Sequence, residues 1–179
     1  MVTFDDVSEG TVASNQYTGM VITGGSVLTQ SSQLNSVFPP QSPPNVLYNY
    51  LNGTITVNFT TSVVSIGAFV TGNTGIVLSA FNGATLLGTS STSGANYVGS
   101  AGTPNQFLQL LFPTITSASF FSSNGTNSFT IDNLTVGGTI INNSAVPEPA
   151  TWLMMLIGFG GMGLTIRNRR RRAGLPQIA

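Results

Sequence analysis

The stretch "SVVSIGAFVTGNTGIVLSAFNGATLLGTSS" (residues 62–91) decides the fold class of this chain. Apolar residues recur at every second position of its first part, at Val64, Ile66, Ala68 and Val70. This period-2 pattern is typical of a strand with one buried face. Two further apolar runs follow, separated by Asn82-Gly83, a dipeptide typical of a type I′ hairpin turn, whose central residues need positive φ. The stretch therefore predicts neighbouring antiparallel strands.

Similar short apolar runs lie on both sides of this stretch. Besides TITVNF (54–59), strands are expected at YTGMVI (17–22), SVLT (26–29), VLYN (46–49), QFLQLLF (106–112), ITSASFF (115–121) and SFTIDNLTV (128–136). FPPQSPPN (38–45) is expected to be a loop, and Pro113 and Asn124-Gly125 to separate the later strands. No segment before Ala150 has a helical period. About eight to ten short strands predict an antiparallel β-sandwich or jelly roll.

One predicted strand breaks its own alternation. In SFTIDNLTV the apolar positions are Phe129 and Ile131, then Leu134 and Val136, so the inward parity flips across Asp132-Asn133. A one-residue bulge reconciles the two halves. The alternative is that one strand ends here and another begins.

Missing residue types exclude most functions of the β-rich part. The chain has no His, Cys or Lys, and its charged residues before Ala145 are Asp5, Asp6, Glu9 and Asp132. A surface without basic groups cannot neutralise phosphates, so we expect no nucleic-acid binding. Without the common general base, thiolate or amine, we predict that the protein is not an enzyme. A glycoside hydrolase with paired carboxylates remains a remote alternative.

The C-terminal segment differs sharply in composition. Residues 150–166 carry no charge, and the chain's five basic residues follow at once, as Arg167, Arg169, Arg170, Arg171 and Arg172. Seventeen residues form roughly 25 Å of helix, the short limit for spanning a hydrocarbon core. We predict one transmembrane α-helix in inner-membrane lipid, with Trp152 at the interface and the arginines in the cytoplasm. A buried helix of a soluble domain is less favoured, because a small β unit can cover only one of its faces.

These segments predict four regions. They are a β-sandwich domain at 1–141, a linker at 142–149, the transmembrane helix at 150–166 and a basic cytoplasmic tail at 167–179. The β domain is expected on the periplasmic side.

The order Val-Pro-Glu-Pro-Ala (146–150), apolar Gly-rich span, then arginine cluster closely resembles the PEP-CTERM sorting signal. The resemblance implies a substrate of exosortase, a membrane enzyme of Gram-negative bacteria thought to cut at the motif. Pro147, Glu148 and Pro149 are carried over as recognition or processing elements. The resemblance to this signal also implies a non-catalytic cell-surface or extracellular-matrix (biofilm) protein, which the membrane holds until processing releases it.

The β-rich part also resembles a known group. Its TFDD (3–6), SIGAFVTGNTGIVLSAFNGATLLGTSS (65–91) and FTIDNLTV (129–136) are similar to the jelly-roll domains that commonly precede this tail, which are similar to galactose-binding-like carbohydrate modules. The resemblance implies binding of surface polysaccharide (exopolysaccharide), which we keep as the alternative function. Tyrosines able to stack on sugar rings or to pack in the core are Tyr17, Tyr48, Tyr50 and Tyr97.

In related carbohydrate modules a structural Ca²⁺ often sits where the first and last strands meet. By that resemblance Asp5, Asp6 and Asp132 are candidate ligands, because carboxylates, carbonyls and waters supply the oxygens that Ca²⁺ needs. The alternative is that Asp5, Asp6 and Glu9 lie in a solvated N-terminal loop.

The sequence MVTFDDVSEG (1–10) has neither the basic start nor the apolar core of a signal peptide. Export requires one, so we expect a misassigned start site or a trimmed chain. Insertion through the tail alone is the alternative.

Overall fold

The computed structural model describes residues 1–50, 53–125 and 127–137, a part of the chain that holds eight β-strands and no α-helix. The chain divides into two units, Met1–Ile140 and Ile141–Ala179, and the description concerns the first. The strands are β1 (Met20–Thr23), β2 (Gly25–Thr29), β3 (Asn45–Asn49), β4 (Ile55–Gly72), β5 (Ile76–Asn82), β6 (Thr85–Ser91), β7 (Gln106–Ser122) and β8 (Phe129–Gly137). All of their pairings are antiparallel. The prediction of a mostly β, antiparallel fold is confirmed.

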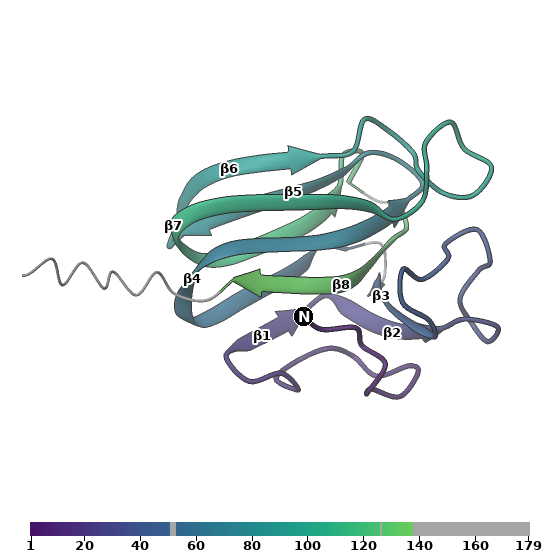
Figure 1. Cartoon of the computed structure of the whole chain (residues 1–179), viewed down its shortest axis with the longest axis horizontal. Helices are drawn as coiled ribbons and strands as arrows, with labels where there is room; N and C mark the ends of the chain where they lie inside the picture. Colours follow the sequence, from purple (N-terminus) through teal and green to yellow (C-terminus); the bar gives the residue numbers. More distant parts are fainter. Residues whose placement is uncertain (51–52, 126, 138–179) are drawn as a thin grey trace, which may run out of the picture. The chain divides into compact units, whose positions relative to one another are not determined.

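The strands form one continuous sheet in the order β2-β3-β8-β4-β7-β5-β6, with β1 beside β4 (Figure 1). The long strands β4 and β7 each contribute to two layers. The second half of β4 pairs with β8 and with the first half of β7, so that β2, β3, β8, β4 and β7 form one layer. The first half of β4 pairs with β1 and with the second half of β7, which continues to β5 and β6 in the other layer.

An irregularity in the β4–β7 pairing lies where the two strands pass between the layers. Val63 pairs with Ile115 and Ser65 with Leu111, so three residues of β7 stand opposite one residue of β4. The extra residues bend the strands. Pro113 lies among them, inside β7, at a place where it interrupts no regular ladder. Our prediction that Pro113 separates two strands was wrong. Residues 55–59 and 62–70, which were expected in two strands, likewise belong to the single strand β4.

The same irregularity changes which valine is buried. Ile66, Ala68 and Val70 lie in the core as predicted, but Val63 is buried next to them and Val64 is only half-buried. The buried side chains of β4 thus change from odd positions (Ile55, Val57, Val63) to even ones (Ile66, Ala68, Val70) where the strand passes between the layers.

The predicted bulge in β8 is confirmed. Gly67 pairs with Thr135 and Phe69 with Asp132, so two residues of β8 stand opposite Ala68 alone. One of the two is Asn133, which has φ of 49°. Asparagine tolerates the left-handed region better than most residues do, which suits it to this position.

The predicted hairpin forms one residue later than expected. Asn82 pairs with Thr85, so Gly83 and Ala84 are the turn's central residues. Gly83 has φ of 57°, whereas Asn82 does not have positive φ. Glycine at the first central position is typical of a type II′ turn rather than type I′.

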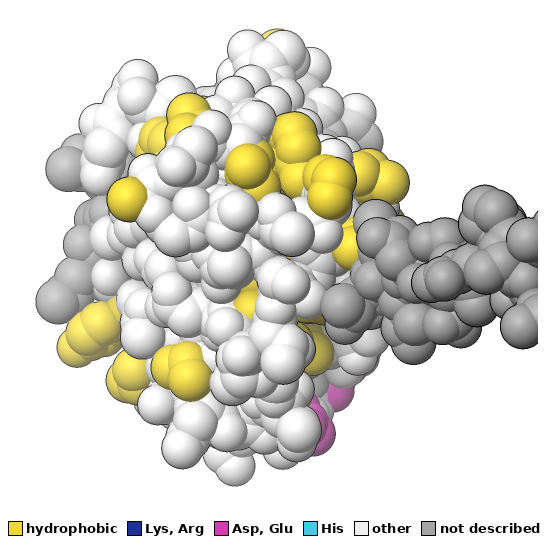
Figure 2. Space-filling model, turned by 90° about the vertical axis from the view of Figure 1, so that its left-hand side faces the viewer, with side chains coloured by type: hydrophobic (Ala, Val, Ile, Leu, Met, Phe, Trp, Pro, Cys, Tyr) yellow, Lys and Arg dark blue, Asp and Glu magenta, His cyan; other side chains and the backbone are white. Residues whose placement is uncertain are grey.

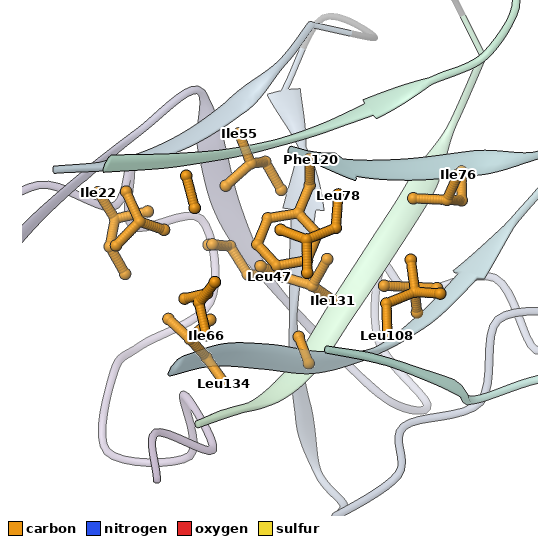
Figure 3. Packing of buried hydrophobic residues seen from close by; sticks show 14 of the residues in the cluster. Ile22, Leu47, Ile55, Ile66, Ile76, Leu78, Leu108, Phe120, Ile131 and Leu134 are labelled. Atoms are coloured by element: carbon orange, nitrogen blue, oxygen red, sulfur yellow. The ribbon is translucent and has the colours of Figure 1, made fainter. Parts of the chain in front are cut away.

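The core lies between the two layers (Figure 3). Ile55, Leu78 and Phe120 come from one layer and face Ile66 and residues of β8 in the other. Burying an aliphatic or phenyl side chain of this kind stabilises a fold by about 1.5–3 kcal/mol. The apolar positions of opposite layers therefore hold the sheet folded on itself.

The N-terminal segment crosses the edge of this arrangement without forming a strand of its own. Val2 forms a bridge with Leu134 of β8, and Val12 with Ser26 of β2. Phe4 is buried in the core. Among the described residues, no helix is long and apolar enough to cross a membrane. The predicted linker, span and tail at 142–179 lie outside the described residues.

Candidate functional site

A pocket of about 570 Å³ lies on the outer face of β2, β3 and β8. Ser26 pairs with Tyr48, and Tyr48 with Thr130, so these residues form a row across the three strands. Their neighbours along each strand, Val27, Leu47 and Ile131, point into the core. Since side chains of a strand alternate between faces, the row points outward and makes the floor of the pocket.

Most of one wall comes from the loop between β2 and β3. Gln33, Leu34, Asn35 and Phe38 line the pocket from this loop. Leu34 and Phe38 are buried against Val46 in a second, smaller apolar cluster, which anchors the loop on the outer face of the sheet. Tyr50, Asn73 and Ser128 line the pocket from other segments.

A carboxylate fastens the start of this loop. Glu9 accepts hydrogen bonds from the Thr29 N–H at 3.0 Å, the Ser32 hydroxyl at 2.6 Å and the Gln33 N–H at 3.1 Å. These bonds, with the Ser32 hydroxyl first among them, lower the pKa of Glu9 below its ordinary value. The wall is therefore tied to the N-terminal segment while Glu9 is ionised.

The four candidate tyrosines divide into two pairs. Tyr48 and Tyr50 line the pocket, with 51% of Tyr50 exposed. The Tyr48 hydroxyl lies 3.5 Å from the Ser128 hydroxyl. Tyr17 packs edge-on against Phe4, with 5.9 Å between ring centroids, and Tyr97 stacks on Phe38 at 6.4 Å. Packing explains the second pair, and only the first pair lines this pocket.

The hydroxyl of Tyr17 is also tied to an acid. It donates to the Asp6 carboxylate at 2.9 Å. Burial and this carboxylate raise the pKa of Tyr17 above its ordinary value. Asp6 therefore bonds to a tyrosine that packs against the buried Phe4.

Asp132 and Asp5 lie near the other end of the wall loop. Asp132 is only 2% exposed and accepts the Ser42 N–H at 2.7 Å and the Asn133 N–H at 2.6 Å. Burial raises its pKa, these backbone donors oppose the rise, and the charge of Asp5 adds to it. Asp5 itself accepts the Asn45 N–H at 3.0 Å.

The structure thus brings Asp5 close enough to Asp132 for their charges to interact. Asp6 accepts the Tyr17 hydroxyl instead, and no three acidic side chains of the described residues group in a way that could hold a metal ion. A calcium ion between Asp5 and Asp132 would need most of its six to eight oxygens from carbonyls and waters. Calcium binding at Asp5, Asp6 and Asp132 stays a prediction.

Sequence patterns had identified only the tyrosines of this pocket. Tyr48 lies in β3, and Tyr50 directly follows the last residue of that strand. Gln33, Asn35 and Asn73 come from loops whose sequences carry no strand periodicity. Their approach to the tyrosines depends on how the loops fold over the sheet.

Similar proteins were found for the fold and for the C-terminal motif separately. The unit is similar to the carbohydrate-binding module TmCBM61, solved in complex with beta-1,4-galactotriose (8% identity, 77% of this chain and 99% of that chain covered, TM-score 0.38). It is also similar to a family 6 carbohydrate-binding module (16% identity, 72% of this chain and 92% of that chain covered, TM-score 0.37). A third similar structure is CsCBM6-3 from Clostridium stercorarium in complex with cellobiose (13% identity, 72% of this chain and 92% of that chain covered, TM-score 0.33). At these TM-scores, nothing about a ligand of this chain follows from them.

No curated protein matches the chain in sequence. The predicted sorting residues Pro147, Glu148 and Pro149 and the membrane flank of Trp152 and the arginines lie outside the described residues. All of them except Arg172 fall within the stretch that matches a known sorting signal, residues 145–171. The chain carries the PEP-CTERM protein-sorting motif at its C-terminal end.

Proposed function

We propose that this is a non-catalytic, exported cell-surface or extracellular-matrix protein, sorted through its PEP-CTERM motif and processed by an exosortase-like membrane enzyme. The observation that carries the proposal is the motif match at 145–171. The match joins the Pro-Glu-Pro core, the uncharged span and the arginine cluster in one signal. Such a signal has a use only at a membrane.

The proposed topology is a single pass through the inner membrane. Residues 150–166 form the span, Trp152 lies at the interface, and Arg167 and Arg169–Arg172 remain in the cytoplasm. The β unit (1–141) and the linker (142–149) are then periplasmic. Processing at the linker sends the β unit to the cell surface or the medium.

The test replaces Pro147, Glu148 and Pro149 together by Ala, in exosortase-bearing cells and with an export signal supplied. Hydropathy of the span is unchanged, so we expect normal membrane insertion and loss of the released form. Mass spectrometry of released wild-type protein should show a C-terminus near the motif, without the span and the arginines. Released protein with an intact C-terminus contradicts the proposal.

The topology has its own test. A reporter fused after Ala179 should behave as cytoplasmic, and one inserted before Val146 as periplasmic. Recovery of the full chain in the soluble fraction contradicts the membrane span.

The second candidate function is carbohydrate binding by the β unit, as a jelly-roll-like module that adheres to surface polysaccharide. The pocket favours it, because a half-exposed aromatic ring (Tyr50) stands beside amide and hydroxyl groups in a cavity of ligand size. Its described lining contains no carboxylate, whereas a glycoside hydrolase needs two, on either side of the scissile bond. Binding without hydrolysis is therefore the form of the proposal, and a glycan array with the protein tests it.

A further inference from the structure

Among the described residues that line the pocket, none has a charged side chain. We infer that it binds a segment of a neutral polysaccharide and rejects anionic ones such as polyuronates. This inference rests on the proposed carbohydrate-binding function and adds the substrate class. It concerns the outer face of β2, β3 and β8, with Tyr50 at its rim.

The first step is the match between the lining and uncharged sugar. Gln33, Asn35 and Asn73 each carry an amide with two N–H donors and an acceptor oxygen, and Ser26 and Thr130 add hydroxyls. Sugar hydroxyls also donate and accept, so such a lining can pair with them in either direction. An aromatic ring supplies the apolar surface on which the C–H face of a pyranose packs.

The second step is charge. All five basic residues of the chain lie at 167–172, so residues 1–137 offer no Lys, Arg or His side chain to an anionic sugar. Consistent with this, the face in Figure 2 shows no Lys or Arg among its described atoms, and acidic side chains only at one corner. Gly10, which lines the pocket, follows Glu9, the carboxylate bonded to the wall loop. A carboxylate or sulfate entering the pocket would lose water without gaining a positive partner, which is costly.

The third step is that the β2–β3 loop, which forms the wall, is held in place before a ligand binds. Glu9 holds the loop at Thr29, Ser32 and Gln33, and Asp132 holds it at Ser42. Between these points Leu34 and Phe38 pack on the sheet. A wall fixed at both ends does not have to be ordered when the ligand arrives, which lowers the cost of binding.

The experiment measures binding of the full chain in detergent to neutral polysaccharides (glucan, galactan, mannan) and to anionic ones (alginate, polygalacturonate), at low ionic strength. Every protein tested carries Gln in place of Arg167 and Arg169–Arg172, so that the tail itself does not attract the anionic polymers. Tyr50→Ala removes the exposed ring, and Phe107→Ala, an exposed aromatic of β7 outside the pocket lining, is the matched control. We expect binding to at least one neutral polymer, weakened about fivefold or more by Tyr50→Ala and unchanged by Phe107→Ala. Asn73→Arg should create binding to the anionic polymers.

Each other result overturns the inference. Stronger binding to anionic than to neutral polymers by the protein with an intact pocket refutes the charge argument and leaves the carbohydrate function standing. If Tyr50→Ala leaves binding to neutral polymers unchanged, the pocket is not the binding site. Absence of binding to every polymer refutes both this inference and the carbohydrate function, whereas the sorting proposal depends on the processing experiment alone.

Discussion

Replacement of Asp132 tests whether its carboxylate is a buried charge that acts as an acceptor for two segments. The side chain sits at the β8 bulge and accepts N–H groups from Ser42, ninety positions away, and from Asn133. In Asp132→Ala both donors lose their acceptor. Each buried donor left unsatisfied costs about 1–3 kcal/mol, and removing the buried charge offsets part of that cost. We expect a net loss of about 2–4 kcal/mol.

Asp132→Asn is the matched variant. Its amide oxygen can still accept, and the buried charge is gone, so stability near neutral pH should stay within about 1 kcal/mol of the original. For a domain of this size 1 kcal/mol shifts Tm by roughly 2–4 °C. The alanine variant should therefore melt several degrees lower, and the asparagine variant close to the original.

The pH dependence has a definite sign. Burial raises the folded-state pKa of Asp132, so its ionisation disfavours folding. The contribution of the group to stability is complete below its unfolded pKa of about 3.9 and is lost as the pH rises through the higher folded value. Asp132→Asn lacks this loss, so its stability relative to the original should improve between about pH 4 and pH 7.

Urea unfolding followed by far-UV circular dichroism, at several pH values, measures these differences. The reasoning is refuted if Asp132→Ala unfolds at the original midpoint, or if Asp132→Asn costs as much as Asp132→Ala. A difference between the original and Asp132→Asn that does not vary with pH would show that the carboxylate is not desolvated.

Three further outcomes are expected of the β unit. Ile66→Asp should cost more than about 4 kcal/mol, because it buries an unpaired charge in the core, while Asn58→Asp on the exposed face of the same strand should leave urea unfolding nearly unchanged. Gly67→Ala should cost about 1–3 kcal/mol in the same assay, because a Cβ there lies 2.8 Å from the Phe107 ring and 2.9 Å from a backbone carbonyl, and adding Phe107→Ala should recover only part of the loss. If calcium binds at the predicted acids, millimolar Ca²⁺ should raise Tm relative to chelator and Asp132→Ala should abolish the difference, whereas identical melting curves would leave the acids without a metal.

Several features of the fold were predictable because they depend on neighbours in the chain. The alternation at Ile66, Ala68 and Val70 follows from the pleat of a strand, which puts every second side chain on one face. The parity change across Asp132-Asn133 predicted the bulge for the same reason. Where the local pattern was incomplete the prediction failed, as at Pro113, which looked like the end of a strand and lies inside one.

By itself the sequence determined the mostly β, antiparallel class of fold, the position of most strand segments and the C-terminal signal, since each of these depends on residue type or on spacing within a few positions. Only the tertiary structure decided that β4 and β7 serve two layers, and that Ser26, Tyr48 and Thr130 share a row beneath a loop fastened by Glu9. The physical reason is that strand order and register come from competition among long-range pairings. Residues as far apart as Ser42 and Asp132 come into contact only when one set of strand pairings has formed.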